Sequence, residues 1–170
     1  MTKIEIKNLK GKVLFSHETE NNSIKKTLEK AVKQNVDLTG ANLINTNLTN
    51  TNLKNANLKN ANLKNAILVN VNLSHSILGN ADLENADLEN AELEGAELEG
   101  TNLKNTNLKG AGFHSAHLKN TNLQHAFMQN VYMQDTCLKG ADLTGAFVRE
   151  SDLLEANLID TILTGINYCR

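Results

Sequence analysis

Proline and tryptophan are absent from this chain of 170 residues, and its large aromatic side chains are limited to four Phe and two Tyr. Hydrophobic residues nevertheless make up 40% of the sequence. A conventional core in a domain of this size uses more large aromatic side chains. The composition therefore indicates one domain whose core is built from smaller apolar residues.

Cysteine is also scarce, since Cys137 and Cys169 are the only two. They cannot form a disulfide framework. No apolar run approaches the length of a membrane span, and the opening residues MTKIEIKNLK lack the apolar core of a signal peptide. The formal net charge of −2 does not favour direct contact with nucleic acid. We therefore expect a cytoplasmic protein that contacts neither membrane nor nucleic acid directly.

A repeat of five residues fills the sequence from Val36 to Arg170, giving 27 pentapeptides in unbroken register. The third residue of every pentapeptide, counted from Leu38, is apolar, and 22 of these residues are Leu. Five helical steps of about 100° would scatter these Leu side chains around an α-helix. In a flat strand they would alternate between the two faces. The chain must therefore turn within each repeat, which predicts a coil with one inward Leu per side.

The other repeat positions fit this coil. Two residues before the apolar centre stands a small residue, Ala in 14 repeats and Thr in 7. Two residues after it stands Asn in 12 repeats or Gly in 7, which are types that tolerate positive φ in tight turns. The flanking residues are mostly polar, so we expect them to point outward.

The first 35 residues lie outside the repeat. β-rich segments flank a turn at Asn8–Gly11, which predicts a β-hairpin over residues 3–15. A capping cluster ending at Ser23 precedes an amphipathic segment, which predicts a helix over residues 23–34. Repeat arrays need terminal caps. We therefore expect an N-terminal cap at residues 1–35 and a repeat domain at residues 36–170.

Phrases such as ANLKN at Ala56–Asn60, ADLEN and AELEG closely resemble the A(D/N)LXX motif of the pentapeptide-repeat protein family. The resemblance covers about four-fifths of the chain. It implies an all-β solenoid, a right-handed quadrilateral parallel β-helix with four pentapeptides per coil. With about 4.8 Å between coils, nearly seven coils would form a rod roughly 30 Å long. The hairpin and helix would form its small N-terminal cap.

With four repeats per coil, residues 20 apart become stacked neighbours, and several apolar residues then fall at outward positions. We expect one face to carry the Phe127–Phe147 pair with Ile67 and Val69, and the adjoining face to carry Tyr132. Exposed apolar clusters mark contact surfaces, so these five residues are the candidate partner-binding site. The alternative is a local hydrophobic ladder without a partner.

The last repeats are unusually apolar, which predicts a head-to-head homodimer because an open coil edge invites pairing. The candidate dimer interface consists of Ile159, Ile162, Leu163, Ile166 and Tyr168.

Two groups of polar residues lie at outward positions that could carry chemistry or bind a charged partner. Glu97, His117 and Cys137 are spaced 20 apart in the order of a thiol relay, but a convex surface without an oxyanion donor or pocket does not favour catalysis. We therefore expect that the protein is not an enzyme and that it has no cofactor and no metal site.

Eight acidic residues ring one coil, where they either pair with Lys on neighbouring coils or form a docking site for a basic partner: Asp82, Glu84, Asp87, Glu89, Glu92, Glu94, Glu97 and Glu99. We call these eight residues the acidic belt.

The sequence thus favours a non-catalytic protein-binding or structural scaffold rod whose partner is unknown. The family resemblance implies an alternative, a DNA-mimicking modulator or protector of DNA gyrase or another topoisomerase. The repeat region has 15 acids and 9 bases, whereas roughly 30 Å of duplex DNA carries about 18 negative charges. A purely structural role through end-to-end stacking is the third possibility.

Overall fold

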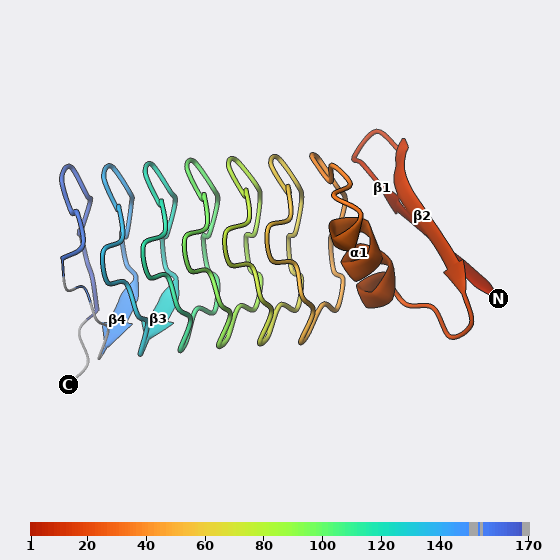
Figure 1. Cartoon of the computed structure of the whole chain (residues 1–170). Helices are drawn as coiled ribbons and strands as arrows, with labels where there is room; N and C mark the ends of the chain where they lie inside the picture. The colour runs from red at the N-terminus through yellow and green to blue at the C-terminus, as the bar shows by residue number, and fades with distance from the viewer. Residues whose placement is uncertain (150–152, 154, 168–170) are drawn as a thin grey trace.

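The computed structural model describes residues 1–149, 153 and 155–167. The N-terminal segment forms strand β1 (Thr2–Lys7), strand β2 (Val13–Thr19) and helix α1 (Ile24–Lys33). A stack of coils follows, in which β3 (Phe127–Gln129) and β4 (Phe147–Arg149) lie on adjacent coils (Figure 1). No helix in this described part has the length and hydrophobicity needed to cross a membrane.

The hairpin is longer than the sequence pattern predicts, because its strands pair from Thr2 to Thr19. The second half of β2 is polar, so the sequence has no alternating apolar pattern there to predict a strand. Its backbone hydrogen bonds to β1 form regardless of side-chain type. The turn is closed by Asn8, whose Oδ1 accepts hydrogen bonds from the backbone N–H groups of Lys10 and Lys12, both at 3.0 Å. Gly11 supplies the positive φ of +80° that this turn needs.

Helix α1 begins after Ser23, whose side chain accepts a hydrogen bond from the N–H of Lys26 at 3.2 Å. This N-cap satisfies one of the free N–H groups of the first turn. Leu28 and Ala31 are fully buried on the inner face of the helix. The helix therefore contributes its apolar face to the same core as the coils.

The N-terminal segment is joined to the first coil by backbone hydrogen bonds. The N–H of Asn42 donates to the carbonyl of Lys7 at 2.8 Å, and Ile6 beside it is buried. Glu29 on α1 adds a side-chain contact, since its Oε1 accepts the N–H of Asn52 at 3.1 Å. These contacts cover the end of the core that the first coil would otherwise expose.

Parallel backbone pairings join residues 20 apart along the stack, from Asn42 with Asn62 to Phe147 with Asn167. Four pentapeptides therefore complete one coil. Most repeats pair at a single residue because the chain turns again at once, so extended strands are few. The three-residue pair of β3 and β4 is the longest parallel pairing described.

The core is a column of inward side chains. Every described Leu centre from Leu38 to Leu143 has at most 2% of its surface exposed. The larger replacements Phe113, Met128 and Met133 are also fully buried. Thr residues at the small inward position are satisfied in different ways. The hydroxyl of Thr101 donates to the carbonyl of Leu78 in the previous coil at 2.8 Å, that of Thr106 donates to the carbonyl of Leu103 in its own coil at 2.7 Å, and that of Thr51 is buried without a partner among the described residues. Ala and Thr are therefore both tolerated beside the axis.

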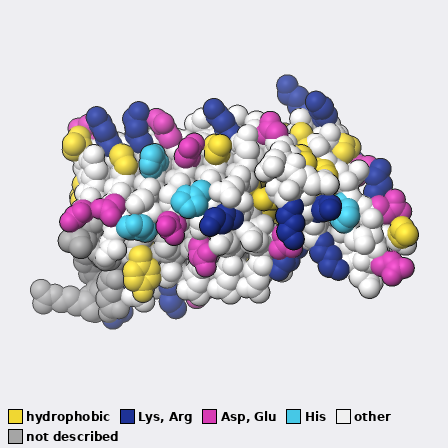
Figure 2. All heavy atoms as spheres, in the orientation of Figure 1, with side chains coloured by type: hydrophobic (Ala, Val, Ile, Leu, Met, Phe, Trp, Pro, Cys, Tyr) yellow, Lys and Arg dark blue, Asp and Glu magenta, His cyan; other side chains and the backbone are white. Residues whose placement is uncertain are grey.

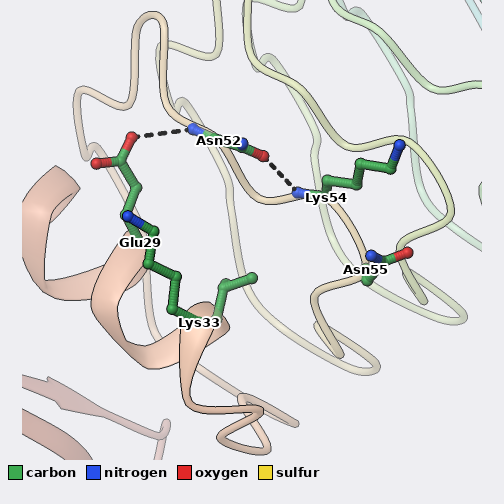
Figure 3. Close-up of a pocket in the computed structure, with 6 residues that line it drawn as sticks. Glu29, Lys33, Asn52, Lys54 and Asn55 are labelled. Carbon is green, nitrogen blue, oxygen red and sulfur yellow. Dashed lines mark hydrogen bonds between the residues drawn. The ribbon is translucent and has the colours of Figure 1, made fainter.

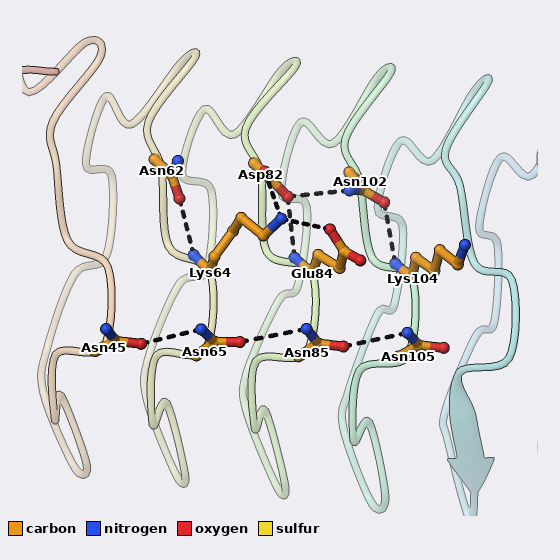
Figure 4. A network of polar contacts seen from close by, with 10 residues as sticks. All are labelled: Asn45, Asn62, Lys64, Asn65, Asp82, Glu84, Asn85, Asn102, Lys104 and Asn105. Carbon is orange, nitrogen blue, oxygen red and sulfur yellow. Dashed lines mark hydrogen bonds and ion pairs between the residues drawn. The ribbon is translucent and has the colours of Figure 1, made fainter.

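Two sets of Asn side chains stabilise the turns. Asn residues at the fifth repeat position have positive φ and stack as a ladder, in which Asn85 Nδ2 donates to Asn65 Oδ1 at 3.3 Å (Figure 4). Asn or Asp before the centre accepts the N–H two residues later, as Asn62 does from Lys64 at 3.1 Å. The second contact gives a physical reason for the D/N of the repeat, namely that its side chain closes the turn.

Candidate functional site

The most prominent apolar feature on the outside of the coils is a pair of stacked rings. Phe127 on β3 and Phe147 on β4 have ring centroids 5.0 Å apart and planes inclined by 7°. They remain 45% and 36% exposed. The next residues, Met128 and Val148, point inward and are buried. Core packing therefore does not account for the two rings.

The other members of the predicted apolar face do not all join this pair. Ile67 is 43% exposed in the same ladder, but Asp87 and Asn107 lie between it and Phe127. Val69 is half-buried one position after a buried centre. The structure therefore unites only the two Phe residues, and Ile67 with Val69 forms a separate small patch.

Tyr132 lies on a neighbouring ladder, where its backbone pairs with Gly112. Its side chain is 59% exposed. It borders a hollow of about 250 Å³ that the glycine leaves open, with Ser74 and Glu94 among the lining residues. Sequence reasoning missed Ser74 and Gly112. The available signal was a glycine at a repeat position that usually holds Asn or Asp.

The acidic belt is partly neutralised by neighbouring Lys residues. Lys64 Nζ lies 2.6 Å from Glu84 Oε2 and 4.0 Å from Asp82 Oδ2, and Lys119 Nζ lies 3.0 Å from Glu99 Oε1. The hydrogen bond and charge of Lys64 lower the pKa of Glu84 below its usual value. Such exposed pairs contribute at most about 1 kcal/mol each.

The expected pairing is incomplete. Lys104 extends away from Glu84 in Figure 4, and no ion pair joins these two residues in the described part of the chain. Glu89 accepts a weak hydrogen bond from Asn107 at 3.4 Å, and no ion pair with Lys109 occurs among the described residues. Residue spacing places such groups on one ladder but leaves their rotamers undetermined. Figure 2 shows basic and acidic side chains interspersed over the face in view.

Glu97, His117 and Cys137 do form one ladder of consecutive backbone pairings. No hydrogen bond or ion pair connects their side chains among the described residues. Glu97 and His117 border a shallow hollow of about 480 Å³, whose lining does not include Cys137. Within the described ranges, no cluster of three or more His, Cys, Asp or Glu residues is placed to hold a metal ion.

A third hollow lies between α1 and the first coils and measures about 510 Å³ (Figure 3). Glu29 and Lys33 border it from the helix, and Lys54 and Asn55 border it from the coil. Asn52 connects its two sides, accepting a hydrogen bond from the N–H of Lys54 at 3.1 Å while its own N–H donates to Glu29. This polar junction attaches the helix to the coils.

Exposed aliphatic side chains gather in the last described repeats. Leu158, Ile159, Ile162 and Leu163 are 38%, 57%, 47% and 45% exposed. Leu158 and Leu163 are inward centres of their repeats that stay exposed in the last described coil, whereas Ile166, at the small inward position, packs half-buried against the core. Tyr168, the fifth residue of the predicted dimer interface, lies outside the described residues.

Comparison with protein families gives one match over most of the chain. The model of pentapeptide repeats, eight copies long, matches residues 34–68, 66–105, 96–135, 111–149 and 136–167. A comparison with curated proteins gives no match.

Several solved structures are similar to this chain. A pentapeptide repeat protein from the thylakoid lumen of Arabidopsis thaliana is 24% identical, with a TM-score of 0.48, covering 61% of this chain and 69% of its own. The cyanobacterial protein Rfr23 from Cyanothece is 28% identical, with a TM-score of 0.41 and coverages of 76% and 84%. QnrB1, a plasmid-mediated fluoroquinolone resistance protein, is 21% identical, with a TM-score of 0.45 and coverages of 80% and 79%.

Proposed function

Because the chain belongs to the family of pentapeptide repeat proteins, we propose that it acts as a non-catalytic rod that binds another protein through its outer ladders. Repeat rods present flat arrays of side chains, and such surfaces serve in protein contacts. The family alone does not define a partner. The partner therefore depends on the surface of this particular chain.

The exposed Phe127–Phe147 stack is the observation that carries the proposal. Both residues occupy the repeat position that holds Asn or Asp in many other repeats, where the side chain closes the turn. Each Phe therefore replaces a turn-closing polar group with an exposed apolar ring. Exposed aromatic side chains are enriched among the residues that dominate binding energy at interfaces. A contact surface explains this substitution, whereas core packing does not.

Affinity capture from a lysate of the source organism tests the proposal. The wild type is compared with the double variant Phe127→Asn/Phe147→Asn, which restores the repeat's usual residue at both positions. Ile77→Asn is the matched control, because it makes the same kind of change on another ladder. We expect one stoichiometric protein that the control retains and the double variant loses. Equal recovery by all three forms would refute the Phe surface.

We also propose that the exposed side chains of Ile159, Ile162 and Leu163 mediate self-association, with Ile166 supporting them from the core side. The topoisomerase alternative receives less support, because basic and acidic side chains are interspersed over the face shown in Figure 2. Inhibition of gyrase supercoiling at about micromolar protein, a concentration typical of binding energies near −8 kcal/mol, would instead favour that alternative.

A further inference from the structure

A missing side chain opens a hollow on the ladder that contains Glu92, Gly112 and Tyr132. These residues follow one another in backbone pairing, Glu92 with Gly112 and Gly112 with Tyr132. A Cβ atom built on Gly112 would meet nothing within 4 Å. The resulting hollow of about 250 Å³ is smaller than a typical pocket for a drug-sized ligand. It is therefore suited to a single side chain. Its lining consists of Ser74, Glu92, Glu94, Gly112, His114 and Tyr132.

Ser74 gives this hollow an unused polar group. Only 6% of the Ser74 surface is exposed. Its backbone is satisfied, because its N–H donates to Asn72 Oδ1 at 3.0 Å and its carbonyl accepts the N–H of Asn55 at 3.0 Å. The hydroxyl has no hydrogen-bond partner among the described residues. The hydroxyl is not sealed from solvent but lies at the wall of the hollow, where it is free to bond to a ligand's polar atom.

The remaining lining residues select for positive charge. Glu92 and Glu94 contribute two exposed carboxylates, and Glu92 Oε2 is oriented by a hydrogen bond from Asn72 Nδ2 at 2.5 Å. Tyr132 contributes an aromatic ring that is 59% exposed. His114 is also part of the lining, and its Nδ1 lies 3.8 Å from Oδ2 of Asp135, which is not a lining residue. No Lys or Arg belongs to the lining.

We propose that this hollow is a binding site for one arginine side chain of a partner protein. A guanidinium group stacks on aromatic rings and forms paired hydrogen bonds with carboxylates. Tyr132 supplies the ring, Glu94 and Glu92 supply the carboxylates, and the Ser74 hydroxyl accepts a further N–H. The surrounding acidic belt favours a partner segment with additional basic residues. The inference rests on the proposed binding role of the rod and gives that role a defined chemistry at a second surface.

The site can be tested without knowing the partner. The full chain, labelled with ¹⁵N, is titrated with the blocked tripeptide Gly-Arg-Gly, and backbone shifts are followed by NMR. The control peptide replaces arginine with citrulline, which has nearly the same shape but no charge. We expect saturable shifts at Ser74, Gly112 and Tyr132 with the arginine peptide. Charged hydrogen bonds contribute about 1.5–3 kcal/mol, so binding of the citrulline peptide should be at least about tenfold weaker.

Gly112→Asn is the decisive variant, because Asn is the usual residue at this repeat position and fills the hollow without disturbing the turn. It should fold normally and weaken arginine binding by at least about tenfold. Ile77→Asn introduces the same residue on another ladder and should bind as the wild type does. Glu94→Gln should weaken binding without filling the hollow.

Unchanged affinity in folded Gly112→Asn, or equal affinity for the citrulline peptide, would overturn the site. Absence of any saturable shift in the wild type would overturn it as well. These outcomes are independent of the capture experiment. A partner retained through the Phe pair, together with failure of the peptide titration, would refute the arginine site alone. Arginine binding without any captured partner would instead count against the proposed Phe surface.

Discussion

Phe127 and Phe147 lie one coil apart, and their rings stack at 5.0 Å with an angle of 7° between the planes. The parallel pairing of β3 and β4 imposes this arrangement, because it places the two Cα atoms opposite each other. The spacing of neighbouring strands, about 4.8 Å, matches the separation of stacked rings. A solenoid of this kind thus turns two identical residues, 20 positions apart in sequence, into a continuous aromatic surface.

Replacement of both rings by Asn should change stability little. Loss of the stack removes about 0.5–1.5 kcal/mol, while each new Asn can accept the N–H two residues later and recover about 0.5–1.5 kcal/mol. We therefore expect the free energy of unfolding of Phe127→Asn/Phe147→Asn to stay within about 1.5 kcal/mol of the wild type. Urea denaturation followed by circular dichroism measures it. A loss of several kcal/mol would show that the rings serve folding.

Alanine substitution at Gly100 should destabilise the protein more than the same change at Gly40. Both glycines have φ of +69°, so the backbone strain is equal. A Cβ on Gly100 would lie 2.5 Å from Oδ1 of Asn80, whereas a Cβ on Gly40 would meet nothing within 4 Å. We expect Gly40→Ala to cost about 1–2 kcal/mol from the left-handed conformation and Gly100→Ala to cost more.

Thermal denaturation of the two single variants measures this difference. The double variant Asn80→Gly/Gly100→Ala supplies the control, because it removes the clashing oxygen and should recover the excess loss. Equal effects at Gly40 and Gly100 would contradict close packing between the turns of successive coils.

Acid should weaken the contacts of Asp142. Burial raises the pKa of Asp142, but hydrogen bonds from Thr144 and Gln124 outweigh it, so the pKa lies below its usual value. A carboxylate with a lowered folded-state pKa stabilises the fold above its unfolded pKa of about 3.9, and this stability is lost as pH falls through the folded value. The melting temperature of Asp142→Asn should therefore depend less on pH below about 4. Identical acid profiles for variant and wild type would contradict the assignment.

Self-association should depend on the exposed residues of the last described repeats. Ile159 is 57% exposed, so Ile159→Arg places a charge in the proposed interface without opening the core. Sedimentation velocity should show dimers of the wild type and monomers of this variant. Val13→Arg is a suitable control, since Val13 is also exposed, at 42%, but lies on the hairpin at the other end. Unchanged sedimentation of Ile159→Arg, or a monomeric wild type, would contradict the interface.

Much of the fold could be predicted from the repeat itself. The requirement for a turn in every five residues follows from geometry, and the inward position of residues such as Leu83 follows from the apolar pattern. The family resemblance inferred from repeats such as ANLKN and ADLEN is confirmed by the match to the pentapeptide repeat model. Stacking of Phe127 on Phe147 followed from their spacing of 20 together with the four repeats per coil that the resemblance implies.

Features that depend on rotamers or on neighbouring ladders could not be predicted in this way. Lys104 has the spacing to pair with Glu84 but extends elsewhere, because a flexible surface side chain has many conformations of similar energy. The hollow at Gly112 arises because glycine has no side chain. In the sequence, this glycine is only a departure from the Asn or Asp that the motif has at that position. The predicted dimer interface includes Leu163 and Ile166, although both occupy inward repeat positions.

Site-specific photo-crosslinking in living cells of the source organism tests the central claim, that the Phe ladder is a protein-binding surface. The photoreactive residue p-benzoyl-phenylalanine replaces Phe127 in one form and Ile77, on another ladder, in the control. We predict one discrete cross-linked protein from position 127 that is absent from position 77. No cross-link at position 127, or the same products from both positions, would contradict the claim.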